Sequence, residues 1–176
     1  MKRRSTRELT LAALFVAVTA VLSQIVVPMP LVPFNLAVLA VFLCGSLLPR
    51  RAALLSQLCY LLLGAVGVPV FAQFSAGPSV LFGVTGGYLM AYPVMAWLVA
   101  LLIQVWAKES FWKRMAVMVA ALVPCYLFGT AWFALYLHKG FWEAAMLACV
   151  PYIPFDLTKG LAASYIGPLV QRKISR

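Results

Sequence analysis

The stretch Leu9–Val27, LTLAALFVAVTAVLSQIVV, decides the fold class because it contains no charged residue. A helix of about 20 apolar residues can cross a hydrocarbon core of about 30 Å. The stretch follows the basic sequence KRRSTRE at positions 2–8, as a signal peptide would. It is longer than the apolar core of a typical signal peptide, and no small-residue cleavage site follows it cleanly. We therefore expect a retained membrane helix.

The composition of the whole chain points to the same solvent. Of its 176 residues, 65% are hydrophobic and 10% are charged, and the mean hydropathy is +1.00. A soluble domain has roughly 45–50% apolar and about 25% charged residues. This composition excludes a soluble globular enzyme and a disordered chain. We expect one membrane-embedded domain over residues 1–176.

Further apolar segments predict an all-α integral membrane protein with six crossings. The segments are Leu9–Val27, Asn35–Leu48, Ala52–Val66, Val80–Ala107, Met115–Leu137 and Cys149–Val170. The second and third are short, and Pro49-Arg50-Arg51 between them predicts a tight helical hairpin.

The region Gly67–Ser79 is too apolar for an ordinary loop and too interrupted by glycine and proline for a helix. Irregular backbone at membrane depth is tolerated only where protein or a cavity satisfies it. We expect a re-entrant, lid-like loop here, with further outer loops at Pro28–Phe34 and His138–Ala148.

The charged residues predict the orientation. The chain has 14 Lys and Arg against 4 Asp and Glu, a net charge of +10, and membrane proteins keep Lys and Arg in cytoplasmic loops. Six crossings that start inside leave only Lys139 outside and Lys159 within the last helix. Both termini are therefore expected in the cytoplasm of a bacterial cell, with the protein in its cytoplasmic (inner) membrane. The positive charge then implies no nucleic-acid partner.

The strongest candidate site is Pro154–Lys159, PFDLTK, in the last segment. Asp156 and Lys159 are three residues apart and lie on one helical face. Charged groups within a span are rare, face the protein interior and are candidates for function. A paired acceptor and donor suit a small polar ligand with N–H and C=O groups. The alternative is a structural ion pair that holds two helices together.

Four more residues are candidates for the same outer cavity. Gly83–Leu89, GVTGGYL, lacks the spacing of a nucleotide-binding loop, and its small residues predict close helix packing. Such packing lets Thr85 and Tyr88 face a buried cavity. Asn35 and Gln73 are polar groups in apolar runs and need partners. They belong to the outer face that also receives the charged pair.

Two alanines of the first segment, Ala13 and Ala17, form a small-xxx-small face, which serves internal packing or docking to another membrane protein. An enzyme is not expected, because the chain has one Asp, one His and no paired carboxylates, and no nucleophile stands beside a base. Its four cysteines form no CxxC pair, so neither a metal site nor a cofactor is expected; packing is their predicted role.

The chain resembles the BioY family, the biotin-binding S components of energy-coupling factor (ECF) transporters. The matching stretches are Val32–Asn35 (VPFN), Leu48–Arg51 (LPRR), Tyr60–Ala72 (YLLLGAVGVPVFA), Gly83–Leu89 (GVTGGYL) and Pro154–Lys159 (PFDLTK). The resemblance implies six helices and an extracytoplasmic vitamin pocket with outer loops as lids. It implies that Asp156, Lys159 and Gln73 face the ligand, and that Ala13 and Ala17 dock onto a transmembrane coupling subunit.

Biotin itself suits the predicted lining. Its ureido head has two N–H donors and one C=O acceptor beside an apolar ring, which a charged pair among Phe71, Phe74 and Tyr88 complements. The chain has no Walker motif, so it is not expected to hydrolyse ATP itself, and the resemblance implies ATPase subunits as partners together with the coupling subunit. The family pattern Thr-Leu-Gln-Thr is replaced here by Asn35–Val38. The alternatives are an S component for another vitamin and a non-transporting membrane scaffold.

Overall fold

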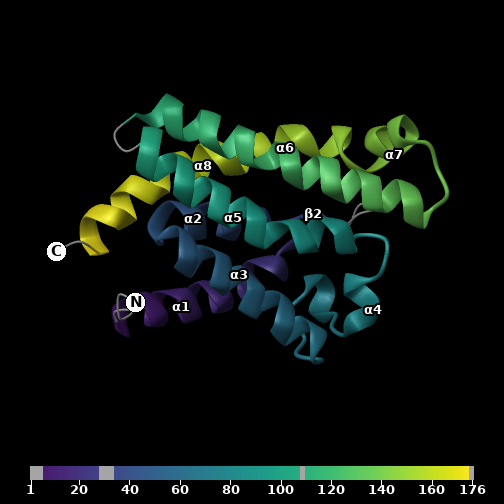
Figure 1. Cartoon of the computed structure of the whole chain (residues 1–176), viewed down its shortest axis with the longest axis horizontal. Coiled ribbons are helices and arrows are strands. Elements are labelled where there is room, and N and C mark those ends of the chain that lie inside the picture. Colours follow the sequence, from purple (N-terminus) through teal and green to yellow (C-terminus); the bar gives the residue numbers. More distant parts are fainter. Residues whose placement is uncertain (1–5, 28–33, 108–109, 175–176) are drawn as a thin grey trace.

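The computed structural model describes residues 6–27, 34–107 and 110–174. Its helices are α1 (Thr6–Ser23), α2 (Ala37–Leu47), α3 (Arg50–Ala65), α4 (Pro78–Leu81), α5 (Gly86–Trp106), α6 (Phe111–Tyr136), α7 (Phe141–Ala148) and α8 (Ile153–Ile174) (Figure 1). Single 3-10 turns lie at Ala72–Phe74 and Val150–Tyr152. Strands β1 (Val26–Val27) and β2 (Phe34–Asn35) form an antiparallel ribbon that the sequence did not predict, with Val26 opposite Asn35 and Val27 opposite Phe34.

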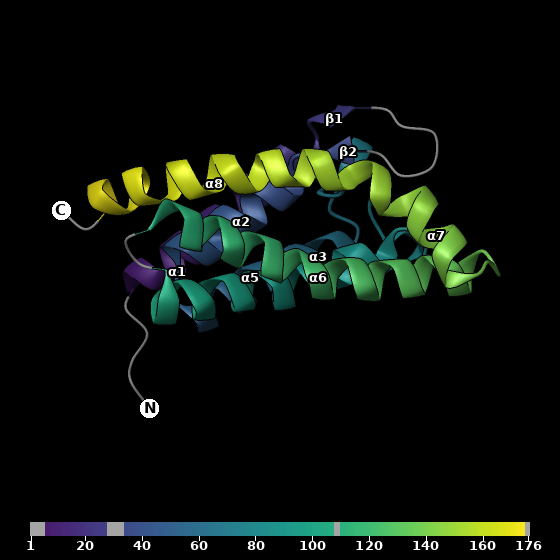
Figure 2. The same cartoon turned by 90° about the horizontal axis from the view of Figure 1, so that it is seen from above.

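The long helices α1, α2, α3, α5, α6 and α8 run roughly along the long axis of the molecule (Figures 1 and 2). Both views place the beginning of α1 and the end of α8 at one end of this bundle. Helices α4 and α7 and the β1–β2 ribbon lie toward the other end. The short elements are therefore gathered where the sequence predicts outer loops.

Three of the described helices are long and apolar enough to cross a membrane: α1, α5 and α6. Helix α2 is apolar but has only 11 residues, which rise about 16 Å at 1.5 Å per residue. That is about half of a hydrocarbon core of about 30 Å. The helical membrane fold is confirmed, and the count of six crossings stays a prediction.

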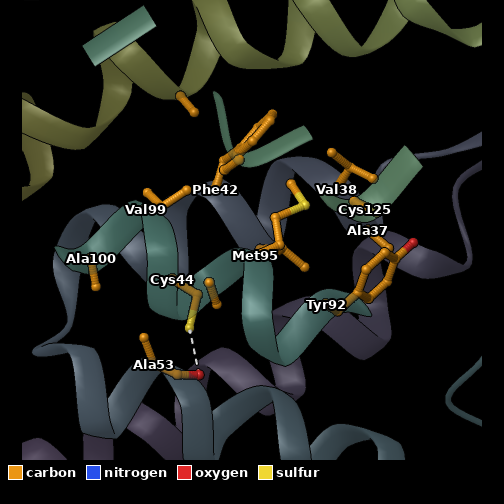
Figure 3. Packing of buried hydrophobic residues seen from close by; sticks show 14 of the residues in the cluster. Ala37, Val38, Phe42, Cys44, Ala53, Tyr92, Met95, Val99, Ala100 and Cys125 are labelled. Atoms are coloured by element: carbon orange, nitrogen blue, oxygen red, sulfur yellow. Dashed lines mark hydrogen bonds between the residues drawn. The ribbon is translucent and has the colours of Figure 1, made fainter. Parts of the chain in front are cut away.

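The core lies where α2 packs against α3 and α5. Figure 3 shows Phe42 of α2 in one cluster with Met95 and Val99 of α5. On the side toward α3, the thiol of Cys44 lies 3.9 Å from the carbonyl oxygen of Ala53 (Figure 3). These five residues are buried, so the middle of the bundle is a packed apolar core.

The cysteines divide between the core and the surface. Cys44 and Cys125 are buried, as their predicted packing role requires, whereas Cys59 is exposed and Cys149 is half-buried. All four thiols are free. The prediction of a purely packing role is wrong for Cys59, because its position on α3 faces outward.

Several predicted boundaries hold and others change. The hairpin is confirmed, since α2 ends at Leu47 and α3 begins at Arg50. The segment Val80–Ala107 is not one helix: α4 ends at Leu81, and α5 begins only at Gly86. Gly83 lies in this break, where an added Cβ would lie only 2.8 Å from the carbonyl oxygen of Ser79. Residues 28–33 of the first predicted outer loop lie outside the described residues.

The other two predicted outer loops contain short helices. His138–Ala148 includes α7, whose Ala, Leu, Met and Glu residues are good helix formers. Gly67–Ser79 returns to the interior, where Val70 and Phe71 are buried, and it contains the 3-10 turn Ala72–Phe74.

The outward faces of the bundle carry large apolar side chains. Leu62 of α3, Val105 of α5 and Leu135 of α6 are each more than 60% exposed. Extended apolar surface of this kind marks contact with a membrane or another protein. Together with the apolar helices, it indicates that the surrounding solvent is a bilayer.

Candidate functional site

A cavity of about 260 Å³ lies among the β1–β2 ribbon, the segment that follows α3, and helices α2, α5, α6 and α8. It is lined by Phe34, Asn35, Val38, Phe71, Ala72, Gln73, Ser75, Val80, Thr85, Tyr88, Leu89, Tyr92, Leu122, Cys125, Tyr126, Ala148, Tyr152, Asp156 and Lys159. The seven residues predicted to bind substrate, Asp156, Lys159, Gln73, Tyr88, Thr85, Asn35 and Phe71, are all in this lining. The prediction is wrong for the aromatic residue Phe74, which is not part of the lining and is 70% exposed. The shared location of the seven is a finding, and their role in binding stays a prediction.

The charged pair forms the polar centre of the cavity wall. The Nζ atom of Lys159 donates to Oδ1 of Asp156 at 2.6 Å, and the two side chains are only 6% and 7% exposed. Asp156 lies in the first turn of α8, where the helix dipole stabilises a carboxylate. Its second oxygen, Oδ2, accepts a hydrogen bond from the Tyr126 hydroxyl at 2.5 Å. Each carboxylate oxygen thus has a defined partner.

The ammonium group of Lys159 also lies 4.1 Å from the ring centroid of Phe34. A cation over an aromatic face is stabilised electrostatically, and more strongly when it is desolvated. The Phe34 ring is itself supported by Phe155, with centroids 4.9 Å apart. An ammonium group has three N–H donors and a carboxylate can accept several bonds, so the pair retains capacity to bind a polar ligand.

Helices α5 and α6 approach closely at the Gly83–Leu89 stretch, as predicted. An added Cβ at Gly87 would lie 2.3 Å from the Cβ of Trp132, and one at Gly129 would lie 2.1 Å from Cδ1 of Tyr88. Only glycine allows these contacts. The close approach is thus confirmed, and it brings the Tyr88 ring into the cavity lining.

Two hydrogen bonds orient Tyr88 within this wall. Its hydroxyl donates to the carbonyl oxygen of Ala148 at 3.1 Å, and it shares a hydrogen bond of 3.1 Å with Oγ1 of Thr130. Tyr88 therefore links α5 to α6 and to the end of α7. Thr85, one turn earlier, lines the same cavity.

The remaining predicted lining residues differ in environment. The side-chain oxygen of Asn35 accepts a hydrogen bond from the backbone amide of Ala37 at 3.0 Å. This bond stabilises the turn that leads from β2 into α2. Phe71 is 1% exposed and meets Tyr60 edge-on, with ring centroids 5.5 Å apart. Gln73 is exposed and has a left-handed backbone, with φ 58° and ψ 36°.

Two cavity residues that contact the charged pair, Tyr126 and Phe34, were not predicted from the sequence. Phe34 belongs to the VPFN stretch, so its position next to Asn35 offered a signal. Tyr126 lies in an apolar run of α6 with no distinguishing spacing. The predicted docking residues Ala13 and Ala17 are both exposed, one turn apart on α1, and are not part of the cavity lining.

These features define a membrane-embedded binding protein for a small solute. The fold matches a solved structure described as the S-component for biotin from an ECF-type ABC transporter, with a TM-score of 0.88 over 98% of this chain and 94% of that one. The two sequences are only 18% identical, so this likeness concerns the fold.

The sequence comparisons identify the family. The BioY family model matches residues 1–176, and the chain belongs to the BioY family. A relative described as "Biotin transporter BioY" from Thermotoga maritima is 39% identical over 160 residues, covering 91% of this chain and 93% of the relative. A "Probable biotin transporter BioY" from Pyrococcus horikoshii is 37% identical over 165 residues, covering 94% and 96%.

Proposed function

We propose that the protein captures biotin from the extracytoplasmic side and acts as the substrate-binding S component of an ECF transporter. The observation that carries this proposal is the buried Asp156–Lys159 pair in the wall of an otherwise largely aromatic and apolar cavity. The carboxylate accepts from the ureido N–H groups of biotin, and the ammonium donates to its carbonyl oxygen. Hydrogen bonds to charged groups are the stronger ones, and Phe71 and Tyr88 surround the apolar ring.

The proposed topology has six crossings, α1, α2, α3, α5, α6 and α8, with both termini in the cytoplasm. It is supported by the common location of the beginning of α1 and the end of α8 (Figures 1 and 2). The exposed Arg50 and Arg51 in the hairpin agree with the preference of cytoplasmic loops for positive charge. The cavity, lined in part from α4 and α7, then opens toward the outer face of the cytoplasmic membrane.

Membership of the BioY family supports partners for transport in this proposal, and the sequence contains no Walker motif of its own for ATP hydrolysis. ATPase subunits supply the energy, and a transmembrane coupling subunit transmits it. Ala13 and Ala17 form the docking face on α1, where small exposed side chains let a partner helix approach closely. The whole protein reorients in the membrane when the coupling and ATPase subunits act.

Equilibrium binding of radiolabelled biotin to the purified protein tests the proposal. Saturable binding at micromolar ligand is expected, and its absence would remove biotin as the substrate. Competition by other vitamins distinguishes an S component of different specificity. Asp156→Asn and Lys159→Ala should each abolish binding while the protein still folds. Wild-type affinity in both variants would reduce the pair to a structural bridge.

A further inference from the structure

The segment Val70–Phe74 forms one wall of the cavity and has an unusual backbone. Phe71, Ala72 and Gln73 all line the cavity. The consecutive residues Gln73 and Phe74 have φ values of 58° and 55°. This is a left-handed backbone conformation that residues other than glycine and asparagine rarely adopt. Such a backbone persists only where its surroundings hold it.

The contacts that hold this segment come from the end of α1. The hydroxyl of Ser23 donates to the carbonyl oxygen of Val70 at 2.6 Å. The side-chain amide of Gln24 donates through Nε2 to the carbonyl oxygen of Phe71 at 2.9 Å and accepts through Oε1 from the amide of Phe74 at 2.8 Å. Gln24 thus forms hydrogen bonds to the backbone on both sides of the left-handed turn.

Further contacts hold the Gln24 side chain and the Val70 carbonyl group in place. Nε2 of Gln24 also lies 3.0 Å from Oγ of Ser23 and 3.2 Å from the carbonyl oxygen of Ala20. The Tyr60 hydroxyl of α3 donates to the same Val70 carbonyl oxygen at 3.1 Å. Because unsatisfied backbone groups are costly in an apolar environment, this network gives the turn one preferred conformation.

One residue, Ile25, connects Gln24 to β1, which pairs with β2. Strand β2 carries Phe34 and Asn35, on another side of the same cavity. The last residues of α1 are therefore connected to two parts of the cavity wall, by side-chain hydrogen bonds to one and by strand pairing to the other.

We propose that Ser23 and Gln24 are positioning residues for the substrate cavity, which hold Phe71 and Gln73 in its wall through the backbone of Val70–Phe74. Since α1 also carries the exposed Ala13 and Ala17, a displacement of this helix moves the cavity wall with it. The identity of the ligand rests on the proposed function, but the positioning role does not.

Hydrogen–deuterium exchange on the ligand-free protein tests the positioning role without biotin. In Gln24→Met, which keeps side-chain length and removes both hydrogen bonds to Val70–Phe74, amides of residues 70–75 should exchange at least about tenfold faster. Exchange in α5 should not change, which separates a local effect from general destabilisation. Gln104→Met, an exposed glutamine of α5, is the matched control. Unchanged exchange at residues 70–75 in Gln24→Met would overturn the proposal.

The dissociation rate of radiolabelled biotin provides the second measurement. Gln24→Met should release biotin about tenfold faster or more, the effect of losing hydrogen bonds worth about 1.4 kcal/mol. Ser23→Ala should act in the same direction, whereas Ser46→Ala, whose hydroxyl donates to the Phe42 carbonyl within its own helix, should not. Wild-type dissociation from both Ser23→Ala and Gln24→Met would refute the positioning role. Failure of the unsubstituted protein to bind biotin would instead refute the ligand assignment.

Discussion

Gly129→Ala should disturb the cavity through a single added methyl group. Its Cβ would lie 2.1 Å from Cδ1 of Tyr88, whereas carbon atoms in contact are about 3.5 Å apart, so the ring must withdraw by about 1.4 Å. The Tyr88 hydroxyl then loses its hydrogen bonds of 3.1 Å to the Ala148 carbonyl oxygen and to Oγ1 of Thr130. Overpacking costs about 1–3 kcal/mol and each lost bond about 0.5–1.5 kcal/mol, for a total of about 2–6 kcal/mol.

Gly129→Ala should also weaken ligand binding, because the displaced Tyr88 ring lines the cavity. We expect biotin affinity to fall at least about tenfold, which corresponds to about 1.4 kcal/mol. Equilibrium binding of radiolabelled biotin measures the affinity, and thermal unfolding in detergent measures the stability. Gly140→Ala is the matched control: no atom lies within 4 Å of its added Cβ, so both values should stay at wild type.

A double-mutant cycle tests the proposed clash itself. In a Tyr88→Leu background the ring that meets the new methyl group is absent, so Gly129→Ala should cost much less stability than it does in the wild-type protein. An equal cost in both backgrounds would refute the reasoning. Wild-type stability and affinity of Gly129→Ala alone would do the same.

Three further predictions concern the charged pair and the docking face. Lys159→Met leaves the carboxylate of Asp156 without its ion-pair partner and should lower the stability by about 3–5 kcal/mol, as measured by thermal or chemical unfolding. Lys139→Met, which breaks the exposed pair between Lys139, just before α7, and Glu143 of α7, should cost no more than about 1 kcal/mol; equal costs would contradict the burial argument. Tyr126→Phe removes the hydroxyl that donates to Asp156 and should cost about 1.5–3 kcal/mol, with weaker biotin binding in the same radioligand assay; unchanged affinity would show that this bond does not support the site. Ala17→Trp should prevent co-purification with the coupling and ATPase subunits while biotin binding in detergent stays at wild type; normal co-purification would contradict the docking role of α1.

The charged pair and the glycine stretch could be predicted because they violate the local composition. Lys159 and Asp156 lie in an apolar segment, where charged residues are energetically costly and therefore indicate a functional site. Gly87 and its neighbours are small residues in a membrane helix, and small residues there allow close packing. Both inferences depend on one stretch of chain at a time, which is why they did not need the three-dimensional structure.

The contacts between distant segments could not be predicted in the same way. Tyr126 meets Asp156 across two helices, and nothing in its own apolar run indicates which residue it faces. Gln24 lies in an apolar run, and two of its hydrogen-bond partners lie 47 and 50 positions away. Helix crossing and loop conformation decide such contacts, and periodicity does not report either of them.

The short elements were missed for a different reason. The order of the apolar segments predicts an outer loop over His138–Ala148, although the later residues of α7 favour a helix. The β1–β2 ribbon has only two residues per strand, too few for any alternation to be visible.

A structure of the protein with bound biotin is the decisive test of the proposed binding site. We expect biotin in the cavity, with its ureido group in hydrogen-bond contact with Asp156 and Lys159 and its ring against Phe71 and Tyr88. Biotin bound elsewhere, or bound in the cavity without contact to either charged residue, would contradict this expectation.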